Sequence, residues 1–417
     1  MKNRPSPPRV RMTMHAAART VVRCLQDAGH EAMFAGGCVR DLVMGRRPTD
    51  YDVATSAEPP KIITVFRKTR KVGAKFGVIL VHIGGHAIEV ATFRRDLEYA
   101  DGRHPSGVEF TDAREDAMRR DFTLNGMFYD PKTREVVDYV DGQADIRAKL
   151  IRAIGDPDRR FREDHLRLLR AIRFAARLGF KIESATWTAM KANAAQIAGI
   201  APERIREELD MILSDRNRAW AFDRLVASGM LPHLWPSASM VVPHAKKIQA
   251  MLEALPKGAG FEMCMSAILA GLAPYDVEDV CTALRCSNQS TRKITWLVSH
   301  AEALDDPAKL SLADLKLLMA HSAFPELVQM LAARLKTLGL PPTAHRQISA
   351  HARAIRPDDV APPPLLTGHD LASLGVTKGP VYKKILDRVY YAQLNEEISD
   401  RPAAIAFVRT ILQETQK

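Results

Sequence analysis

Two aspartates separated by one residue, Asp50 and Asp52, are the clearest candidates for chemistry in this 417-residue chain. Side chains alternate along a strand, so a strand at residues 51–55 would place both carboxylates on one face. Adjacent carboxylates repel each other unless a cation lies between them, and their hard oxygens suit Mg²⁺, which shares its coordination shell with substrate phosphates. Glu89, in a strand that we predict at residues 87–93, is a candidate third carboxylate, although a solvated glutamate on an edge strand is equally typical. We therefore predict catalysis by Asp50, Asp52 and Glu89, with Mg²⁺ held by the two aspartates.

A glycine pair, Gly36-Gly37, precedes the aspartates and separates a predicted strand at residues 31–35 from a predicted helix at residues 39–44. Glycines at such a junction let a phosphate approach backbone N–H groups at a helix N-terminus, which favours anions. Arg40, one turn into the helix, can clamp the same phosphate. A glycine pair alone is typical of a turn, and an Asp-x-Asp pair alone of a charged loop edge. Their order along the chain favours a nucleotide site.

A second polar motif, Arg119-Arg120-Asp121-Phe122-Thr123-Leu124-Asn125, follows a polar segment at residues 95–112 that we predict to be a long loop. Arg120 and Asp121 can bind a triphosphate and a ribose hydroxyl, respectively. Asn125 joins them as a candidate nucleotide-binding residue. The alternative is a salt-bridged helix start in which Asp121 caps a turn.

A third motif contains Asp164, Arg167, Arg170 and Arg173, whose spacing of three residues predicts that they share one side of a helix. The buried stripe beside them is predicted to consist of Leu166, Leu169, Ile172 and Phe174. A ladder of arginines suits planar, bidentate recognition of phosphates or base edges. An ion-paired surface helix is an equally good interpretation of this motif on its own.

Asp164 and Arg167 have a hydrogen-bonding complement that can select a base. A carboxylate accepts from an exocyclic amino group, and an arginine donates to ring nitrogens or carbonyl oxygens. Cytosine and adenine both present an amino group beside an acceptor, whereas guanine and uracil present the opposite arrangement. The pair therefore predicts acceptance of C and A and rejection of G and U, because a mismatched base would leave a buried polar group unpaired.

The elements that must position these residues divide into a mixed part and a helical part. Strand signals end near residue 140, and helical periodicity interrupted by prolines dominates from about residue 143 onward. We therefore predict an α+β fold. The basic, proline-rich residues 1–12 are predicted to be a disordered arm.

Composition narrows the function classes. Apolar residues make up 46% and charged residues 26% of the chain, which excludes a disordered, collagen-like or small disulfide-bonded protein. The formal net charge of +11 predicts a polyanionic partner such as nucleic acid, nucleotide phosphates or an anionic membrane face. No apolar stretch is long enough to predict a membrane span. Five cysteines without a CxxC pattern indicate a reducing, cytoplasmic location.

Eight segments together resemble one known family. They are, in chain order, GGCVRD, PTDYDVATS, VGAKFGVILV, IEVATFR, YADGRHP, RRDFTLNGMFYDP, EDHLRLLRAIRFAARLGF and ERIREEL. They resemble the class II tRNA nucleotidyltransferases, the CCA-adding enzymes, and the related bacterial poly(A) polymerases. One departure is Gly126, where these enzymes often carry Ala. The resemblance implies a polymerase-beta-like nucleotidyltransferase head with a mixed sheet at residues 13–150, followed by a helical neck at 151–215, body at 216–360 and tail at 361–417.

The resemblance also implies an activity: template-independent addition of CMP and AMP to the 3′ end of tRNA, from CTP and ATP, by a two-metal mechanism that releases pyrophosphate. The VGAKFGV segment resembles the CCA-adding form more than the poly(A) polymerases. The alternatives are a bacterial poly(A) polymerase, an enzyme that adds only CC or only A, and an inactive RNA-binding protein, which the intact aspartate pair disfavours.

The resemblance further implies a role for each matching residue. Asp50 and Asp52 would hold the metal ions, and Asp164 and Arg167 would read the base. The other implied roles are triphosphate contacts by Gly37 and Arg40, nucleotide binding by Arg120, a ribose contact by Asp121, and support of the helix and phosphates by Arg170 and Arg173. Residues 95–112 would be the flexible loop linked to the switch from C to A addition.

Overall fold

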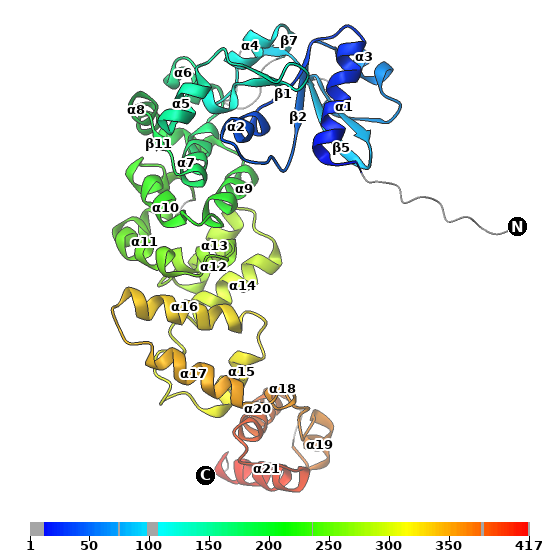
Figure 1. The fold of residues 1–417 in the computed structure, drawn as a ribbon. Coiled ribbons are helices and arrows are strands. Elements are labelled where there is room, and N and C mark those ends of the chain that lie inside the picture. Colours follow the sequence, from blue (N-terminus) through cyan, green and yellow to red (C-terminus); the bar gives the residue numbers. More distant parts are fainter. Residues whose placement is uncertain (1–11, 74–75, 98–106, 236, 377–378, 416–417) are drawn as a thin grey trace, which may run out of the picture. The chain divides into compact units, whose positions relative to one another are not determined.

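The computed structural model describes residues 12–73, 76–97, 107–235, 237–376 and 379–415 (Figure 1). The chain forms two compact units. The first runs to Ala245 and includes Ala283–Arg285, and the second comprises Lys246–Thr282 and the chain from Cys286 onward. The predicted disordered arm lies outside the described residues, apart from residue 12. The predicted boundaries between head, neck, body and tail stay predictions.

A seven-stranded mixed sheet forms the N-terminal part of the first unit. Its strands are β1 (Ala32–Ala35), β2 (Asp52–Thr55), β3 (Thr69–Gly73), β4 (Val78–Ile83), β5 (His86–Thr92), β8 (Phe128–Asp130) and β9 (Glu135–Val137). They are arranged in the order β3-β4-β5-β2-β1-β8-β9. Only the β2–β5 pair is parallel among the pairs of this sheet in the described residues. Through this parallel pairing, Asp52 at the start of β2 lies beside Glu89 of β5.

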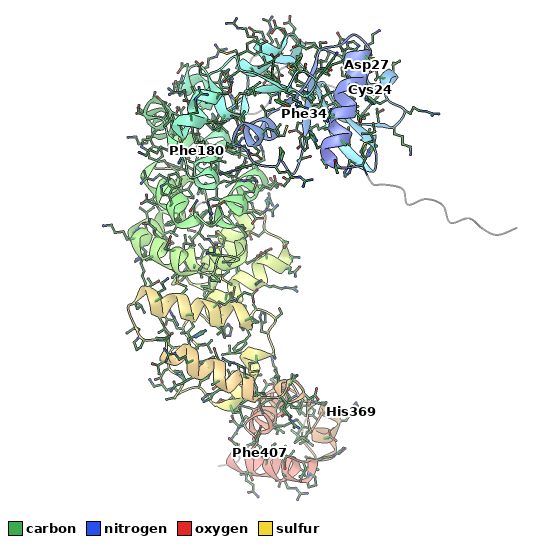
Figure 2. The ribbon with its side chains drawn as sticks, in the orientation of Figure 1. Cys24, Asp27, Phe34, Phe180, His369 and Phe407 are labelled. Atoms are coloured by element: carbon green, nitrogen blue, oxygen red, sulfur yellow. The ribbon has the colours of Figure 1, made fainter. Side chains whose placement is uncertain are left out.

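Helix α1 (Met14–Asp27) begins where the Thr13 hydroxyl accepts a hydrogen bond from the backbone N–H of Ala16, and it ends before Gly29, whose φ of +85° suits glycine. The buried face of α1 packs on β1, β2 and β5. Phe34 of β1 is fully buried, and its ring contacts His15 of α1 with a centroid separation of 6.1 Å (Figure 2). Helix α1 thus packs on the part of the sheet that includes β2, the strand that carries Asp52.

The segment predicted to be a long loop, residues 95–112, contains strand structure at its described ends. Strands β6 (Arg94–Asp96) and β7 (Val108–Phe110) pair as a separate antiparallel sheet. Arg95 and Glu109, which are cross-strand neighbours, also form an exposed ion pair of 2.7 Å. The loop prediction is therefore wrong for these ends, because cross-strand pairing stabilises a pattern that looked merely polar. Residues 98–106 lie outside the described residues.

The rest of the first unit is mainly helical. Its elements are α2 (Gly37–Val43), α3 (Pro59–Val65), α4 (Ala113–Met118), η2 (Thr123–Asn125), α5 (Gly142–Ala148), α6 (Pro157–Glu163), α7 (Arg167–Leu178), α8 (Ser184–Ala192), η3 (Ala194–Gly199), α9 (Pro202–Leu213), α10 (Arg218–Ala227), η4 (Leu231–His233), η5 (Ala238–Met240) and η6 (Val242–His244). Two short strands, β10 (Leu150–Ile151) and β11 (Lys181–Ile182), pair in parallel. Helix α7 packs against α9, α10 and these two strands, so it lies at the centre of this helical part.

The described part of the second unit is helical. Its helices are α11 (Ala245–Ala254), α12 (Phe261–Ile268), α13 (Pro274–Ala283), α14 (Asn288–Ser299), α15 (Leu312–Met319), α16 (Phe324–Thr337), α17 (Thr343–Ala354), α18 (Pro357–Val360), α19 (Gly368–Ser373), α20 (Pro380–Leu394) and α21 (Arg401–Thr415). A mixed sheet followed by helices confirms the predicted α+β fold. Within the described ranges, no helix is long and apolar enough to cross a membrane.

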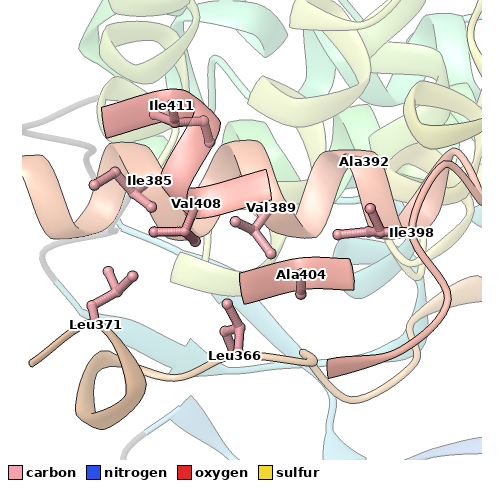
Figure 3. Packing of buried hydrophobic residues seen from close by; sticks show 9 residues of the cluster. All are labelled: Leu366, Leu371, Ile385, Val389, Ala392, Ile398, Ala404, Val408 and Ile411. Atoms are coloured by element: carbon pink, nitrogen blue, oxygen red, sulfur yellow. The ribbon is translucent and has the colours of Figure 1, made fainter. Parts of the chain in front are cut away.

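The last three helices share a core made only of aliphatic side chains. The core residues, which come from α19, α20, α21 and the segments next to them, are Leu366, Leu371, Ile385, Val389, Ala392, Ile398, Ala404, Val408 and Ile411 (Figure 3). Polar groups lie at the helix ends: Asp370 completes a capping box with Thr367 and also pairs with Arg401. His369 beside it is exposed (Figure 2). We call this cluster the tail core.

Three polar contacts join the start of α15 to the end of α20. They are Ser311 Oγ to Tyr391 Oη at 2.7 Å, the backbone N–H of Ala313 to Asn395 Oδ1 at 2.8 Å, and Lys316 Nζ to Glu396 Oε1 at 3.0 Å. Lys316 is only 3% exposed, so its ammonium group depends on Glu396 for charge compensation. These contacts fix α20 on α15.

Candidate active site

Asp52 is the first residue of strand β2, and Asp50 lies two residues before it. The sequence predicts that this strand begins one residue earlier, at Tyr51. Tyr51 between the two aspartates is 4% exposed, and its ring lies 5.1 Å from that of Phe34 and 5.3 Å from that of His15, measured between centroids. Both aspartates are exposed. Because side chains alternate along an extended backbone, anchoring Tyr51 against α1 directs the two carboxylates to the opposite side.

Glu89 lies beside Asp52. The parallel register pairs Val53 with Val90, so the residues that precede them, Asp52 and Glu89, are also neighbours. Strand β5 lies between β4 and β2, so Glu89 does not occupy the edge strand that its alternative interpretation required. Neighbouring protein atoms partly desolvate the carboxylate of Asp52, and this is the largest cause that raises its pKa to about 6. The negative charges of Glu89 and Asp50 raise the pKa further, whereas the positive charge of Arg120 lowers it. The three carboxylates therefore interact electrostatically.

These carboxylates fit a divalent cation that also binds substrate. Their mutual repulsion is the interaction that a cation would relieve, and their donors are hard oxygens. In the described residues, no three His, Cys, Asp or Glu side chains form a complete metal cluster. Mg²⁺ commonly binds one or two carboxylates together with substrate phosphates, and an open pair of aspartates matches that requirement.

Gly36 allows Arg120 to approach the aspartates. Its φ of +72° lies in the left-handed region, and a Cβ there would come within 3.3 Å of Arg120 Nη1 and 4.0 Å of Asp52 Oδ2. Asp116, which is 1% exposed, accepts hydrogen bonds from Arg120 Nη2 at 2.9 Å and from Arg119 Nε at 2.9 Å. Glycine at position 36 and a buried carboxylate at position 116 thus hold Arg120 beside Asp52.

A chain of hydrogen bonds connects Arg40 to the arginine ladder. Arg40 of α2 is 6% exposed and donates to Asn125 Oδ1 at 3.0 Å, and Asn125 Nδ2 donates to Asp121 Oδ1 at 3.2 Å. Asp121 Oδ2 accepts from Arg170 Nε at 2.9 Å and Nη2 at 2.6 Å. Burial alone would raise the pKa of Asp121, but the charge and hydrogen bonds of Arg170 outweigh it and lower the pKa to about 2.

The predicted ladder is divided between a helix and the turn before it. Arg167, Arg170 and Arg173 lie on α7, but Asp164 follows the end of α6 with an extended backbone. The prediction that all four residues share one helix is therefore wrong for Asp164, whose Oδ1 instead accepts from the backbone N–H of Leu166 at 3.2 Å. Arg204 of α9 lies 3.3 Å from Asp164 Oδ2 and holds this carboxylate from the other side.

The three arginines of α7 that line the site, Arg167, Arg170 and Arg173, each have an acidic partner. Arg167 Nη1 donates to Glu163 at 2.9 Å, and Arg173 Nε donates to Glu208 at 2.6 Å. Arg167 and Arg173 are 7% and 8% exposed, which argues against the alternative of a surface helix. The guanidinium groups are therefore oriented before any ligand binds.

One cavity of about 440 Å³ collects these groups. It is lined by Gly36, Gly37, Arg40, Asp52, Arg119, Arg120, Asp121, Asn125, Asp164, Arg167, Arg170, Arg173 and Phe174. Every residue predicted to bind the nucleotide lines this cavity, together with the predicted catalytic residue Asp52. Asp50 and Glu89 act on Asp52 but do not line the cavity. Six arginines against three aspartates give the walls a positive balance that suits a triphosphate.

Comparisons with known proteins match this architecture. The family model "Poly A polymerase head domain" matches residues 32–152, and "Probable RNA and SrmB- binding site of polymerase A" matches residues 179–241. A CCA-adding enzyme of Geobacillus kaustophilus is 33% identical over 392 residues, which cover 92% of this chain and 94% of that protein. The chain belongs to the CCA-adding enzyme family.

Two further comparisons with CCA-adding enzymes support this family assignment. A CCA-adding enzyme of Limosilactobacillus reuteri is 39% identical over 239 residues, so this alignment spans 57% of each protein, somewhat more than half of the relative's length. The crystal structure of the Bacillus stearothermophilus CCA-adding enzyme in complex with CTP superposes with a TM-score of 0.78 at 27% identity, covering 99% of this chain and 100% of the other. The predicted family and fold are confirmed.

Gly126, the departure from the family noted in the sequence, has a steric cause. A Cβ at this position would lie 2.7 Å from Val140 Cγ2 and 3.0 Å from Ile154 Cδ1. An alanine at this position in this chain would therefore need Val140 or Ile154 to shift. Glycine at position 126 fits the close packing next to Asn125.

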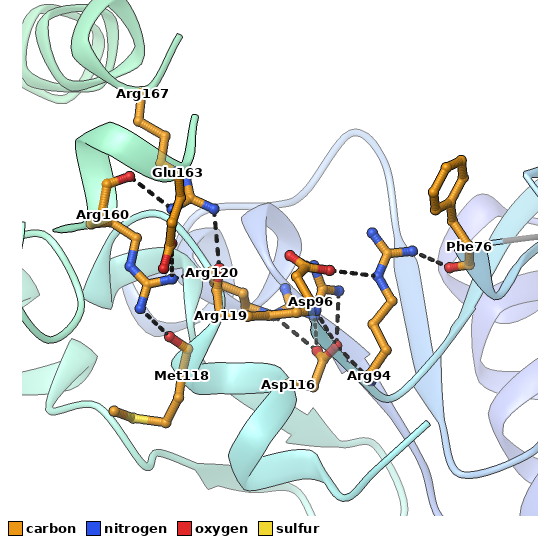
Figure 4. A network of polar contacts seen from close by, with 10 residues as sticks. All are labelled: Phe76, Arg94, Asp96, Asp116, Met118, Arg119, Arg120, Arg160, Glu163 and Arg167. Carbon is orange, nitrogen blue, oxygen red and sulfur yellow. Dashed lines mark hydrogen bonds and ion pairs between the residues drawn. The ribbon is translucent and has the colours of Figure 1, made fainter. Parts of the chain in front are cut away.

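Several residues that shape the cavity were not predicted for the site. Figure 4 shows two connected groups, in which Asp116 pairs with Arg119 and Arg120, and Glu163 pairs with Arg160 and Arg167. The backbone carbonyl of Arg119 joins them by accepting from Arg167 Nη2 at 3.3 Å and Arg160 Nη1 at 3.2 Å. The spacing of four residues from Asp116 to Arg120 and from Glu163 to Arg167 is a usable signal for such pairs. Glu208 and Arg204 carry no comparable signal, because their partners are distant in sequence.

Proposed function

We propose that this chain adds CMP and AMP without a template to the 3′ end of tRNA, using CTP and ATP and releasing pyrophosphate. One observation carries the proposal: Asp52 on β2, Asp164 in the turn before α7 and Arg167 at the start of α7 line the same cavity. The metal-binding carboxylates and the base-reading pair are far apart in sequence, yet one nucleotide can reach both. The names of the family members, and a CTP complex of one of them, support this substrate class.

The arginines of the cavity would bind the triphosphate. Arg40 lies on α2 and Arg120 follows the end of α4, whereas Arg170 and Arg173 lie on α7. Planar guanidinium groups give bidentate contacts with phosphate oxygens. Asp121 would accept a hydrogen bond from a ribose hydroxyl, while its contact with Arg170 keeps it ionised.

Asp50 and Asp52 would hold Mg²⁺ in a two-metal arrangement, which would lower the pKa of the RNA 3′-hydroxyl and neutralise the triphosphate. The chain itself supplies position and charge, which account for most of the catalysis of phosphoryl transfer, so no protein nucleophile is needed. Glu89 adds a third negative charge beside Asp52 and strengthens the preference of the pair for a cation.

Asp164 and Arg167 would read the base. Arg204 and Glu163 orient them before the nucleotide arrives. In Asp164→Ala the acceptor for the exocyclic amino group is lost, so we expect the preference for CTP and ATP over GTP and UTP to fall by about tenfold or more. The measurement is kcat/KM for each nucleotide, with Mg²⁺ affinity as the control that should stay unchanged. Unaltered selectivity would exclude this role.

A direct assay tests the function. Purified protein is incubated with Mg²⁺, labelled CTP and ATP, and a tRNA that lacks its 3′-terminal CCA, and the product ends are sequenced. We expect CCA. Long A tracts formed without CTP would identify a poly(A) polymerase, and products ending in CC or in a single A on a CC-ended tRNA would identify a partial activity. No incorporation would refute the proposal, with Asp52→Asn as the inactive reference.

We also infer a cytoplasmic location. All five cysteines are free thiols, and Cys38, Cys264 and Cys281 are buried. Free thiols are the usual state in a reducing compartment. Fractionation of cells into cytoplasmic and membrane material tests this inference.

A further inference from the structure

Phe174 is the aromatic residue of the nucleotide cavity among the described residues that line it. Its side chain belongs to α7 and is 6% exposed. Three guanidinium carbons lie near its ring centroid: that of Arg173 at 4.4 Å, that of Arg170 at 5.3 Å and that of Arg40 at 5.7 Å. All three distances are within the range in which a cation is attracted to an aromatic face.

The ring itself is held by a second aromatic side chain. Phe122 is fully buried and contacts Phe174 edge to face, with centroids 5.9 Å apart and an interplanar angle of 77°. Phe122 directly follows Asp121, which binds Arg170. The orientation of the ring is therefore coupled to the segment that carries the proposed ribose contact.

Three positive charges around one ring would repel one another without compensation. Each arginine has a carboxylate partner: Arg40 has Asp41 at 2.8 Å, Arg170 has Asp121 at 2.6 Å and Arg173 has Glu208 at 2.6 Å. Their common neighbour is the electron-rich ring of Phe174, which attracts guanidinium groups where an aliphatic side chain would not. The ring is thus a shared support for arginines from α2 and from α7.

We propose that Phe174 is a positioning residue for nucleotide binding: its ring sets the spacing of Arg40, Arg170 and Arg173 so that one triphosphate can contact all three. The proposal rests on the function proposed above and identifies a residue that this function needs. Phosphate oxygens entering the cavity compete with the carboxylates for the N–H donors. The flat ring keeps the guanidinium planes in place during this exchange.

The test compares an aromatic and two aliphatic side chains at position 174. Phe174→Leu and Phe174→Met keep an apolar side chain and remove the ring, whereas Phe174→Tyr keeps the ring. Phe180→Leu is the matched control, because Phe180 follows the same helix (Figure 2) and is 5% exposed. Among the described residues, the cation–ring contacts involve other rings than that of Phe180. Affinities for CTP and for inorganic triphosphate are measured by calorimetry, steady-state kinetics on tRNA lacking CCA, and melting temperature by scanning.

We expect Phe174→Leu and Phe174→Met to weaken triphosphate binding and raise the KM for CTP about tenfold, while kcat changes less than about threefold. Phe174→Tyr should remain within about twofold of the parent, since its ring attracts cations equally well. Phe180→Leu should lower the melting temperature as much as Phe174→Leu does but leave CTP affinity unchanged.

Three results would overturn the proposal: an unchanged KM in the aliphatic variants, an equal KM increase in Phe180→Leu, or a tyrosine variant as weak as the leucine variant. If Phe174→Leu does not fold, Phe174→Met and Phe174→Tyr still decide the question. Failure of the parent protein to incorporate nucleotides would refute the proposed function, whereas the triphosphate titration would still test the role of Phe174.

Discussion

In the tail core every buried side chain is aliphatic, whereas the walls of the nucleotide cavity are built from charged pairs. The second unit places ion pairs such as Arg356–Asp359 on its exposed surface, where they contribute little to folding. Beside the cavity, Arg173 and Glu208 are both buried, and so is Asp121, the partner of the half-buried Arg170, so desolvation is costly unless pairing is close. The difference indicates that the tail core is organised for stability, whereas the cavity accepts an energetic cost to orient groups for an anion.

The largest effect is expected from Asp52→Asn. Losing one carboxylate of the proposed metal site should lower the rate of CMP incorporation by about a thousandfold or more. The fold should not be weakened, because the substitution removes repulsion from Glu89 and Asp50. Incorporation assays and thermal unfolding check both parts. A variant with more than a tenth of the parent rate would contradict the assignment of Asp52.

A smaller effect, confined to stability, is expected from Leu371→Ala in the tail core. Leu371 is fully buried, and removing its side chain should cost about 3 kcal/mol of unfolding free energy. Urea unfolding measures this loss. CTP affinity should stay unchanged, because the described residues that line the cavity all belong to the first unit. A parallel loss of CTP affinity would break the separation between the two regions.

Asp121→Asn should cost about 2 kcal/mol at pH 7, because the pKa of Asp121 is lowered to about 2 from an ordinary value of 3.8. A carboxyl group with a depressed folded-state pKa contributes stability above its unfolded-state pKa, and that contribution is lost as the pH falls through the folded value. The difference between parent and variant should therefore shrink between about pH 4 and pH 2. Urea unfolding at a series of pH values measures it; a pH-independent difference would show that Arg170 is not the cause.

The smallest effect is expected from Asp359→Asn, the surface counterpart of the previous variant. The pair that it breaks joins Arg356, whose side chain is 80% exposed, to Asp359 at 2.7 Å. Solvent and salt screen such a pair, so we expect no measurable change in unfolding free energy at pH 7. A loss as large as that of Asp121→Asn would show that burial is not what distinguishes the two regions.

Local spacing in the sequence was sufficient to predict some of the local geometry. The glycine pair and Asp52 lie within one strand–helix–strand segment, and the structure brings them to the same cavity, as their order along the chain predicted. The three-residue spacing from Asp164 to Arg173 failed at its first member, because the same spacing fits a helix and a turn that precedes one. Spacing alone does not show where a helix begins.

The remaining features depend on contacts between distant segments. Glu208 reaches Arg173 because α9 packs on α7. The sequence near either residue does not predict this ion pair. Phe174 was predicted to be buried, and it is, but its role beside three arginines requires knowing that α2 faces α7 across the cavity. Pairing of β6 with β7 likewise depends on the two ends of a polar segment meeting.

The contacts between α15 and α20 have a consequence for shortened versions of this protein. A chain cut after residue 360 would retain Lys316 and lose Glu396, leaving an ammonium group without its counter-ion on a helix surface that was covered before. Removing the final helices would therefore destabilise α15. Measurements on such a shortened chain would reflect this local destabilisation as well as the loss of the helices.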